Sequence, residues 1–427
     1  MKTAPDQSET LLVPKLRLRH ALGSEAVLRA DGVSVGGAHQ PSLVAPPAMR
    51  STAPLPTACR SRSFGTRVVC FFVLFVFFVD SSSAADWRSA LPGWQYGFPR
   101  DHHIHPEFKT EWWYFTGSLA DESGRRFGYQ LTFFRQGLRP SGAAAATSRF
   151  VVDDLKFAHF AVSDIAAQRF HFEQKIGRGA FGEAGFGADG KLAWIEDWAL
   201  DLKADGTFAL RAKGANAVID LHLASRKPWA VHGENGVSQK AEGEGRASHY
   251  FSGTRMATEG TLVIAGKILR VTGESWLDRE WATNQLTPGQ VGWDWFSLQL
   301  DDGSELMLYQ MRTRGGGLDP NSSGTFIARD GTTQHLRRDD YQLTPLREWA
   351  SPQTGGRYPI AWQLTVPKLA IQLRIDTPLA AQELVLQPVA YWEGLIDMTG
   401  TRAGAAVRGH GYMELTGYAG ALVGLSQ

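Results

Sequence analysis

The chain has 427 residues, of which 43% are hydrophobic and 20% are charged, and its formal net charge is +1. These values are typical of a folded globular protein and exclude an intrinsically disordered chain. No block of basic residues disturbs the near-neutral balance, so the sequence gives no electrostatic indication of a nucleic-acid partner.

The first 85 residues differ in character from the rest. Residues 1–48 carry no periodic pattern, and we interpret them as a disordered tail or a misassigned start ahead of Met49. From Met49, several arginines precede the apolar run "VVCFFVLFVFFV" (68–79), and small residues follow it up to Ala85. This order predicts a secretory signal peptide over 49–85, because the run is shorter than the roughly 20 residues that span a bilayer. We therefore expect export to the periplasm or secretion, with a signal anchor as the alternative.

Both cysteines, Cys59 and Cys70, lie within this leader. Cleavage after Ala85 would leave no thiol, which excludes disulfides, thiolate metal sites and a cysteine nucleophile from the mature chain. Stability must then come from a large apolar core, which a chain of this length can build.

From residue 86 onward the sequence predicts one strand after another. In "RRFGYQLTFFR" (125–135) aromatic and aliphatic residues occupy every second position from Phe127 to Phe133, which is the period of a strand with one buried face. Turn signals separate such runs at 121–124, 187–190, 203–206, 301–304 and 329–331. Helical periodicity is scarce, so we predict an all-β protein.

One hairpin pattern occurs twice. The stretch "WWYFTGSLADESGRRFGYQLTFFR" begins at Trp112, and "WDWFSLQLDDGSELMLYQMR" begins at Trp293. Each has an aromatic strand, an acidic turn and a return strand that ends in an arginine, Arg135 or Arg312. This repeat predicts two tandem antiparallel β-barrel domains, 86–284 and 285–427. A small closed barrel leaves room for one small apolar ligand.

Several motifs resemble one known family. They are "FPRDHHIHPEFKTEWWYFTG" (98–117), "FAHFAVSD" (157–164), "HYFSGTRM" (249–256), "GESWLDREW" (273–281), "GWDWFSLQLDDG" (292–303) and "GHGYMELTGYA" (409–419). Together they resemble the AttH/CrtC-like proteins, a group that contains carotenoid 1,2-hydratases and secreted proteins described as predicted hydrolases. The resemblance implies two lipocalin-like barrels in tandem and no organic cofactor.

The hydratase members of that family carry a functional histidine, an aspartate and aromatic partners, which match His249, Phe251, Trp276 and Asp278 here. Two aromatics depart from the hydratase pattern, which has Trp at the position of Phe251 and Tyr at that of Trp276. The departures and the predicted export both weigh against a carotenoid substrate.

Chemically, Asp278 lies between Trp276 and Trp281, where desolvation would keep its carboxyl protonated as a general acid. His249 would orient the acid or accept a proton, and the aromatic faces of Trp276 and Phe251 would stabilise a carbocation. The alternative is a structural charge cluster in which Arg279 pairs internally.

Other residues are expected to line a pocket. Tyr250, Trp113 and Trp295 are candidate substrate contacts in the aromatic strands. Glu111 is either a polar contact to the ligand or the partner of an arginine such as Arg135, and Glu393 in "YWEG" has the same two interpretations.

The alternating histidines His103 and His105 have the spacing of imidazole ligands on one face of a strand, but no further ligand pair accompanies them. We therefore predict packing at the mouth of a barrel and no metal site. No G-x-S-x-G nucleophile motif and no phosphate-binding glycine loop occur.

Two functions remain open. The first is an exported, cofactor-independent enzyme of hydratase or isomerase type, a carotenoid 1,2-hydratase-like lyase or a secreted hydrolase, acting on an apolar terpenoid- or lipid-like molecule. The second is a non-catalytic lipocalin-like carrier of such a ligand in the cell envelope. An accessory factor at a membrane surface or transporter is a third hypothesis, and the sequence predicts no oligomeric state.

Overall fold

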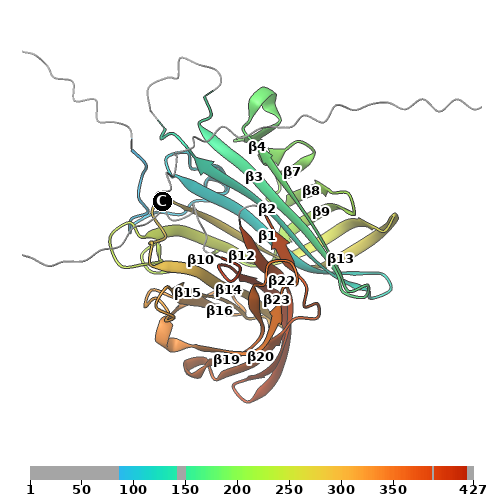
Figure 1. Ribbon diagram of the computed structural model, residues 1–427, viewed down its shortest axis with the longest axis vertical. Helices are drawn as coiled ribbons and strands as arrows, with labels where there is room; N and C mark the ends of the chain where they lie inside the picture. Colours follow the sequence, from blue (N-terminus) through green and yellow to red (C-terminus); the bar gives the residue numbers. More distant parts are fainter. Residues whose placement is uncertain (1–85, 142–150, 387–388, 421–427) are drawn as a thin grey trace, which may run out of the picture. The chain divides into compact units, whose positions relative to one another are not determined.

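The computed structural model describes residues 86–141, 151–386 and 389–420 (Figure 1). The predicted tail and signal peptide lie outside these residues. The described chain consists of strands, loops and four short 3-10 turns, so the all-β prediction is confirmed. The turns are η1 (Arg100–His102), η2 (Ala180–Gly182), η3 (Arg338–Asp340) and η4 (Pro367–Leu369). Within the described ranges no helix is long and apolar enough to cross a membrane.

The first sheet, which we call the first barrel, is antiparallel and has the order β4-β3-β2-β1-β13-β12-β9-β8-β7-β6-β5, with β10 and β11 paired to β12. Its strands are β1 (Thr110–Asp121), β2 (Arg126–Gly137), β3 (Asp154–Asp164), β4 (Arg169–Gly177), β5 (Ala184–Phe186), β6 (Lys191–Ile195), β7 (Trp198–Leu202), β8 (Phe208–Lys213), β9 (Ala217–Ser225), β10 (Ala230–Val231), β11 (Ser238–Gln239), β12 (Ala247–Ile264) and β13 (Lys267–Ala282).

The second sheet, the second barrel, has the order β17-β16-β15-β14-β23-β22-β20-β19-β18, with β21 paired to β22. Its strands are β14 (Gln290–Leu300), β15 (Glu305–Thr313), β16 (Ser323–Ile327), β17 (Thr333–Arg337), β18 (Gln342–Ala350), β19 (Arg357–Val366), β20 (Ile371–Asp376), β21 (Glu383–Val385), β22 (Ala390–Arg402) and β23 (Ala405–Leu415).

The two barrels share one topology. In each, the first strand pairs with both the second and the last strand, β1 with β2 and β13, and β14 with β15 and β23. The repeated hairpins have equivalent registers, since Trp112 pairs with Phe134 and Trp293 with Met311. The repeat seen in the sequence therefore occupies the same place in both sheets.

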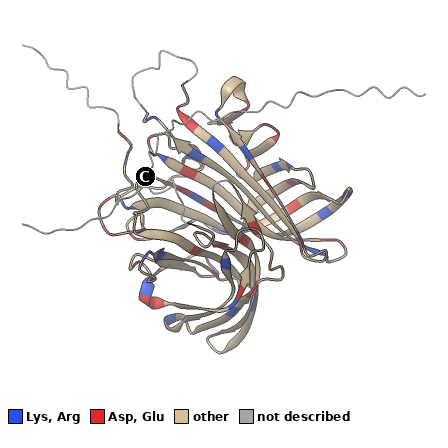
Figure 2. Ribbon diagram, viewed as in Figure 1, with Lys and Arg blue, Asp and Glu red and all other residues tan. Residues whose placement is uncertain are grey.

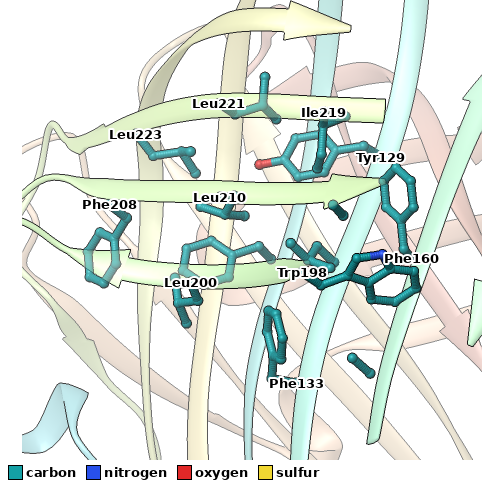
Figure 3. Close-up of a cluster of buried hydrophobic side chains, with 14 of the residues drawn as sticks. Tyr129, Phe133, Phe160, Trp198, Leu200, Phe208, Leu210, Ile219, Leu221 and Leu223 are labelled. Atoms are coloured by element: carbon teal, nitrogen blue, oxygen red, sulfur yellow. The ribbon is translucent and has the colours of Figure 1, made fainter. Parts of the chain in front are cut away.

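Each barrel has its own apolar core. In the first, buried aromatic and aliphatic side chains from β2, β3, β7, β8 and β9 face one another (Figure 3). Burying each large apolar side chain contributes roughly 1.5–3 kcal/mol. A second core fills the second barrel around Phe296, Trp362 and Trp392. Charged residues of both signs are interspersed along the strands of the two sheets (Figure 2).

A third apolar cluster joins side chains of both barrels. Tyr114, Tyr250 and Trp276 come from the first barrel, and Trp295 and Tyr412 are among those from the second. Strand β1 is thus covered on both faces, because Trp113 and Phe115 belong to the core of the first barrel while Tyr114 faces the second. This double burial explains the unbroken aromatic run "WWYF" in place of an alternating pattern.

A β-bulge in β12 changes which side chains face the second barrel. Up to Gly253 the pairing with β13 follows one register, and from Met256 onward it is shifted by one residue. Tyr250 therefore belongs to the cluster between the barrels, whereas Met256 belongs to the core of the first barrel, although their spacing is even.

Close approach of the barrels predicts the effect of one substitution. A Cβ at Gly128 in β2 would lie 2.8 Å from the Tyr412 hydroxyl and 3.0 Å from the Leu395 Cβ. We expect Gly128→Leu to lower the free energy of unfolding by about 1–3 kcal/mol through overpacking. The control is Gly289→Leu, because Gly289 is exposed and its nearest neighbour would lie 4.0 Å away. Equal urea midpoints for the two variants would contradict the packing described here.

Candidate functional site

Apart from Trp295 on β14, the predicted catalytic and substrate-contact residues lie on β1, β12 and β13, but on two different faces. Asp278 pairs with Tyr114 on β1 and with Ser252 on β12, and paired residues share a face. Side chains alternate along a strand, so Trp276 lies on the same face as Asp278, toward the second barrel. His249, Phe251, Trp113 and Glu111 are placed on the opposite face by the same alternation.

Asp278 is buried at the centre of a hydrogen-bond cluster. The Tyr250 hydroxyl donates to Oδ2 at 2.5 Å, and the Trp276 indole N–H donates to Oδ1 at 2.6 Å. The Ser252 hydroxyl also donates to Oδ1. From the second barrel, the Trp295 indole N–H donates to the Tyr250 hydroxyl at 3.1 Å. The two barrels therefore build this cluster together.

Burial dominates the ionisation of this carboxyl and raises the pKa of Asp278 to about 7. The three donors favour the carboxylate but do not outweigh desolvation, and the nearby Glu280 raises the pKa further. Among the described residues Asp278 has no ion-pair partner, because Arg279 points to the other face. A substantial fraction of Asp278 is therefore protonated at neutral pH and able to act as an acid.

His232 is a member of this cluster that the sequence did not reveal. Its Nε2 lies 2.6 Å from the Ser252 hydroxyl, and its Nδ1 lies 2.9 Å from the Thr325 hydroxyl of the second barrel. Burial, followed by the charge of Lys240, lowers the pKa of His232 well below its usual value, so the imidazole is neutral. It adjoins the two-residue strand β10, which is too short to show any periodic signal.

Two glutamates of the second barrel add further buried acid groups. Glu414 accepts a hydrogen bond from the Trp293 indole at 3.0 Å, and burial raises its pKa to about 7. Glu393 is its neighbour across β22 and β23. Glu414 belongs to the motif "GHGYMELTGYA", but no feature of the sequence distinguished it from other glutamates as a candidate functional acid.

A buried lysine lies beside these acids. The Lys240 ammonium is 3.2 Å from a Glu280 oxygen, 3.9 Å from the ring centre of Tyr309 and 4.9 Å from that of Tyr250. Although burial alone would lower the pKa of Lys240, the charge of Glu280 raises it, so the amine remains protonated. Lys240 therefore supplies a fixed positive charge and not a free amine.

His249 does not meet Asp278. Its Nδ1 lies 2.9 Å from the Gly236 carbonyl oxygen, and its ring packs against Trp94 at 4.6 Å between ring centres. Phe251, on the same face, packs against Phe98 and Trp281. Because β12 alternates, neighbouring residues Tyr250 and Ser252 reach Asp278 in their place. Burial lowers the pKa of His249 to about 4.

Glu111 is held in a buried charge cluster at one end of the first barrel. Arg135 and Arg279 donate to its two oxygens at 2.7 and 2.5 Å, and the backbone N–H of His105 lies 3.1 Å from both. These charges lower the pKa of Glu111 despite its burial. Arg279 also lies 3.8 Å from the ring centre of Trp113.

The opening histidines pack into the same cluster. The His105 ring stacks on Trp281 at 3.8 Å, and the His103 carbonyl accepts a hydrogen bond from Arg279 at 2.6 Å. Among the residues that the structure describes, no group of three or more His, Cys, Asp and Glu side chains is arranged to hold a metal ion.

The space beside the Asp278 cluster is narrow. A gap between the barrels is lined by Trp276 and by polar residues that include Thr116, Gln299 and His410, and it leaves no room for a water molecule. A ligand can reach this region only if the side chains or the barrels move apart.

Antiparallel barrels in which each strand pairs mainly with its neighbours in sequence are of the lipocalin-like class. The family profile described as AttH-like matches residues 89–418, and the chain belongs to this family. A crystal structure of an AttH-type protein from Nitrosomonas europaea is 34% identical, with a TM-score of 0.70 over 78% of this chain and 99% of that chain. The predicted AttH/CrtC-like resemblance and the two tandem lipocalin-like barrels are therefore confirmed.

Two further similarities are to kievitone hydratases. The structure of the Nectria haematococca enzyme has a TM-score of 0.60 at 15% identity, covering 79% of this chain and 98% of that chain, which is a similarity of fold. The Fusarium solani subsp. phaseoli enzyme is 26% identical over 157 residues, or 33% of this chain. That match spans 40% of the length of the curated relative.

The Glu111 cluster gives a stability prediction. Glu111→Gln removes a buried negative charge from between Arg135 and Arg279, which leaves both cations uncompensated. We expect the free energy of unfolding to fall by about 3–5 kcal/mol. Glu122→Gln, at an exposed position, should change it by less than about 0.5 kcal/mol. Lost ligand binding at unchanged stability would instead make Glu111 a ligand contact.

The raised pKa of Asp278 predicts a pH dependence of stability. In the unfolded chain an aspartate has a pKa of about 4, whereas burial raises that of Asp278 to about 7. The folded state thus holds the proton more tightly, and this contribution to stability is lost as the pH rises from about 4 through about 7. The free energy of unfolding, measured by urea at several pH values, should therefore change less between pH of about 4 and about 7 in Asp278→Asn than in wild type. Identical slopes for both proteins would contradict the assignment.

Proposed function

We propose that this chain is a hydratase-like enzyme that adds water across a carbon–carbon double bond of an apolar small molecule at Asp278. The observation that carries the proposal is a buried, partly protonated carboxyl that is surrounded by aromatic rings and has no ion-pair partner within the described residues. The similarity to kievitone hydratases supports this reaction type.

The first step is proton transfer. The Asp278 O–H delivers its proton to one alkene carbon, and the π electrons form the new C–H bond. Positive charge then develops on the other carbon. The faces of Trp276, Trp295 and Tyr250 are available to stabilise it through their quadrupoles.

The second step is the addition of water to that carbon. The oxygen lone pair forms the C–O bond, and the surplus proton of the water passes to the Asp278 carboxylate, which restores the acid. The net reaction consumes one alkene and one water and yields one alcohol. Only a proton donor and water are needed, which supports the proposed independence from an organic cofactor.

His232 and Ser252 are the positioning residues in this proposal. The neutral imidazole is fixed between Thr325 and Ser252, and Ser252 in turn donates to Asp278. This chain of contacts holds the carboxyl in one orientation against the aromatic rings. His232 thereby takes the orienting role that the sequence had suggested for His249.

The proposal also includes the class of substrate and the location of the protein. An apolar terpenoid- or lipid-like substrate is supported by the apolar interface cluster, and export by the leader 49–85. We propose a periplasmic or secreted location, with signal anchoring as the alternative, and association with a membrane surface or a transporter. A non-catalytic carrier would use the same interface without turnover.

Asp278→Asn tests the proposal. The full chain would be incubated with an apolar extract of the producing cells, and products would be followed by mass spectrometry. Wild type should convert at least one component into a product heavier by one water. The variant should be about 10²–10⁴-fold slower, because it lacks the acid. The wild-type rate should also fall as the pH rises through about 7.

The matched control is Asp220→Asn, at an exposed position on β9, which should keep the wild-type rate. A component that binds to all three proteins unchanged in mass would refute catalysis and favour the carrier. Conversion at equal rates by wild type and Asp278→Asn would place the chemistry elsewhere.

A further inference from the structure

A second pair of polar side chains, which the proposed mechanism does not involve, is buried between the barrels. Both carboxyl oxygens of Glu393 and the hydroxyl of Tyr114 are buried without a hydrogen-bond partner in good geometry. Glu393 is only 2% exposed. Leaving such groups unsatisfied destabilises a folded protein by about 1–3 kcal/mol each, so they call for an explanation in function.

The two groups face each other across the interface. The Tyr114 and Tyr391 hydroxyls approach Glu393 closely enough to affect its pKa, yet neither makes a well-formed hydrogen bond to it. Tyr391 is instead engaged with His159, whose Nδ1 lies 2.7 Å from its hydroxyl. The Tyr114 hydroxyl lies opposite the Glu393 carboxyl, and the contact between them is not a well-formed hydrogen bond.

The surroundings keep Glu393 neutral. The titratable groups near it are Glu414, Tyr114, Tyr391 and Tyr412, and burial followed by the charge of Glu414 raises the pKa of Glu393 well above the usual value. Burial also raises the pKa of Tyr114 well above its usual value. Both groups thus carry their protons at neutral pH, and each has an O–H to donate.

We propose that Tyr114 and Glu393 form a subsite that binds a carbonyl oxygen of the substrate by two converging hydrogen bonds. This inference rests on the proposed function and narrows it, because the apolar substrate must then carry a ketone or aldehyde. A phenol paired with a neutral carboxylic acid is an effective donor pair for such an oxygen in an apolar site. A carbonyl accepts two hydrogen bonds, whereas a hydrocarbon would leave both donors unpaired.

The subsite is close to the proposed acid. Tyr114 on β1 is the cross-strand partner of Asp278 on β13, and its ring lies 5.2 Å from that of Trp295. A carbonyl held at Tyr114 would therefore place neighbouring carbons of the same molecule beside Asp278. The arrangement favours substrates whose double bond lies near their carbonyl group.

Binding of two matched probes tests the subsite. trans-Chalcone and trans-stilbene are apolar molecules of similar shape, and only chalcone has a carbonyl. Binding to the full chain would be followed by tryptophan fluorescence. We expect chalcone to bind about a hundredfold more tightly than stilbene, because each well-made hydrogen bond to a buried group contributes about tenfold. Tyr114→Phe and Glu393→Leu should each reduce this ratio about tenfold, while Glu393→Gln, which retains a donor, should preserve most of it.

Infrared difference spectra supply a readout that packing alone would not change. The carboxylic C=O band of neutral Glu393 should disappear in Glu393→Gln, and in wild type it should shift on adding chalcone but not stilbene. The subsite is overturned if the infrared spectrum contains no carboxylic C=O band from Glu393. It is also overturned if chalcone binds no more tightly than stilbene, or if neither probe binds. Because binding requires no turnover, this result is independent of whether Asp278→Asn abolishes hydration.

Discussion

The structure depends on the burial of one patch of sheet on both of its faces. Strands β1, β13 and β12 lie in the middle of the first sheet and, on their reverse side, meet the second barrel. Each face is dry, so any polar group placed there must be either compensated or neutral. The two faces meet this requirement in opposite ways.

The inner face compensates its charges. Glu111 is ionised and bound between Arg135 and Arg279, with the aromatic rings of Trp113 and Trp281 against the second arginine. Such a cluster fixes the end of the barrel but leaves nothing available for proton transfer. The charge pairing of this cluster is therefore structural.

The outer face neutralises its acids by desolvation. Asp278, Glu393 and Glu414 all have raised pKa values, and burial is the first cause of each. The one buried cation beside them, Lys240, is paired with Glu280. The same physical effect thus supplies a protonated carboxyl at Asp278 and a hydrogen-bond donor at Glu393.

Much of this could be predicted from the sequence, and the failures have a common physical origin. Alternation and turn signals were enough for an all-β chain, and the repeat beginning at Trp112 and Trp293 indicated two units. Asp278 and Trp276 were recognised as a pair and do lie together. Alternation cannot tell which face of a strand meets a second domain, however, so His249 was grouped with Asp278. His232 reaches the site from a segment without periodicity.

The bulge in β12 between Gly253 and Met256 makes the two faces of this strand depend on its exact number of residues. Upstream of it, even-numbered side chains serve the interface, and downstream they serve the core. Loss of a single residue at the bulge would exchange interface-facing and core-facing positions along the rest of the strand. The number of residues at this point therefore sets which side chains of β12 enter the interface and which enter the core of the first barrel.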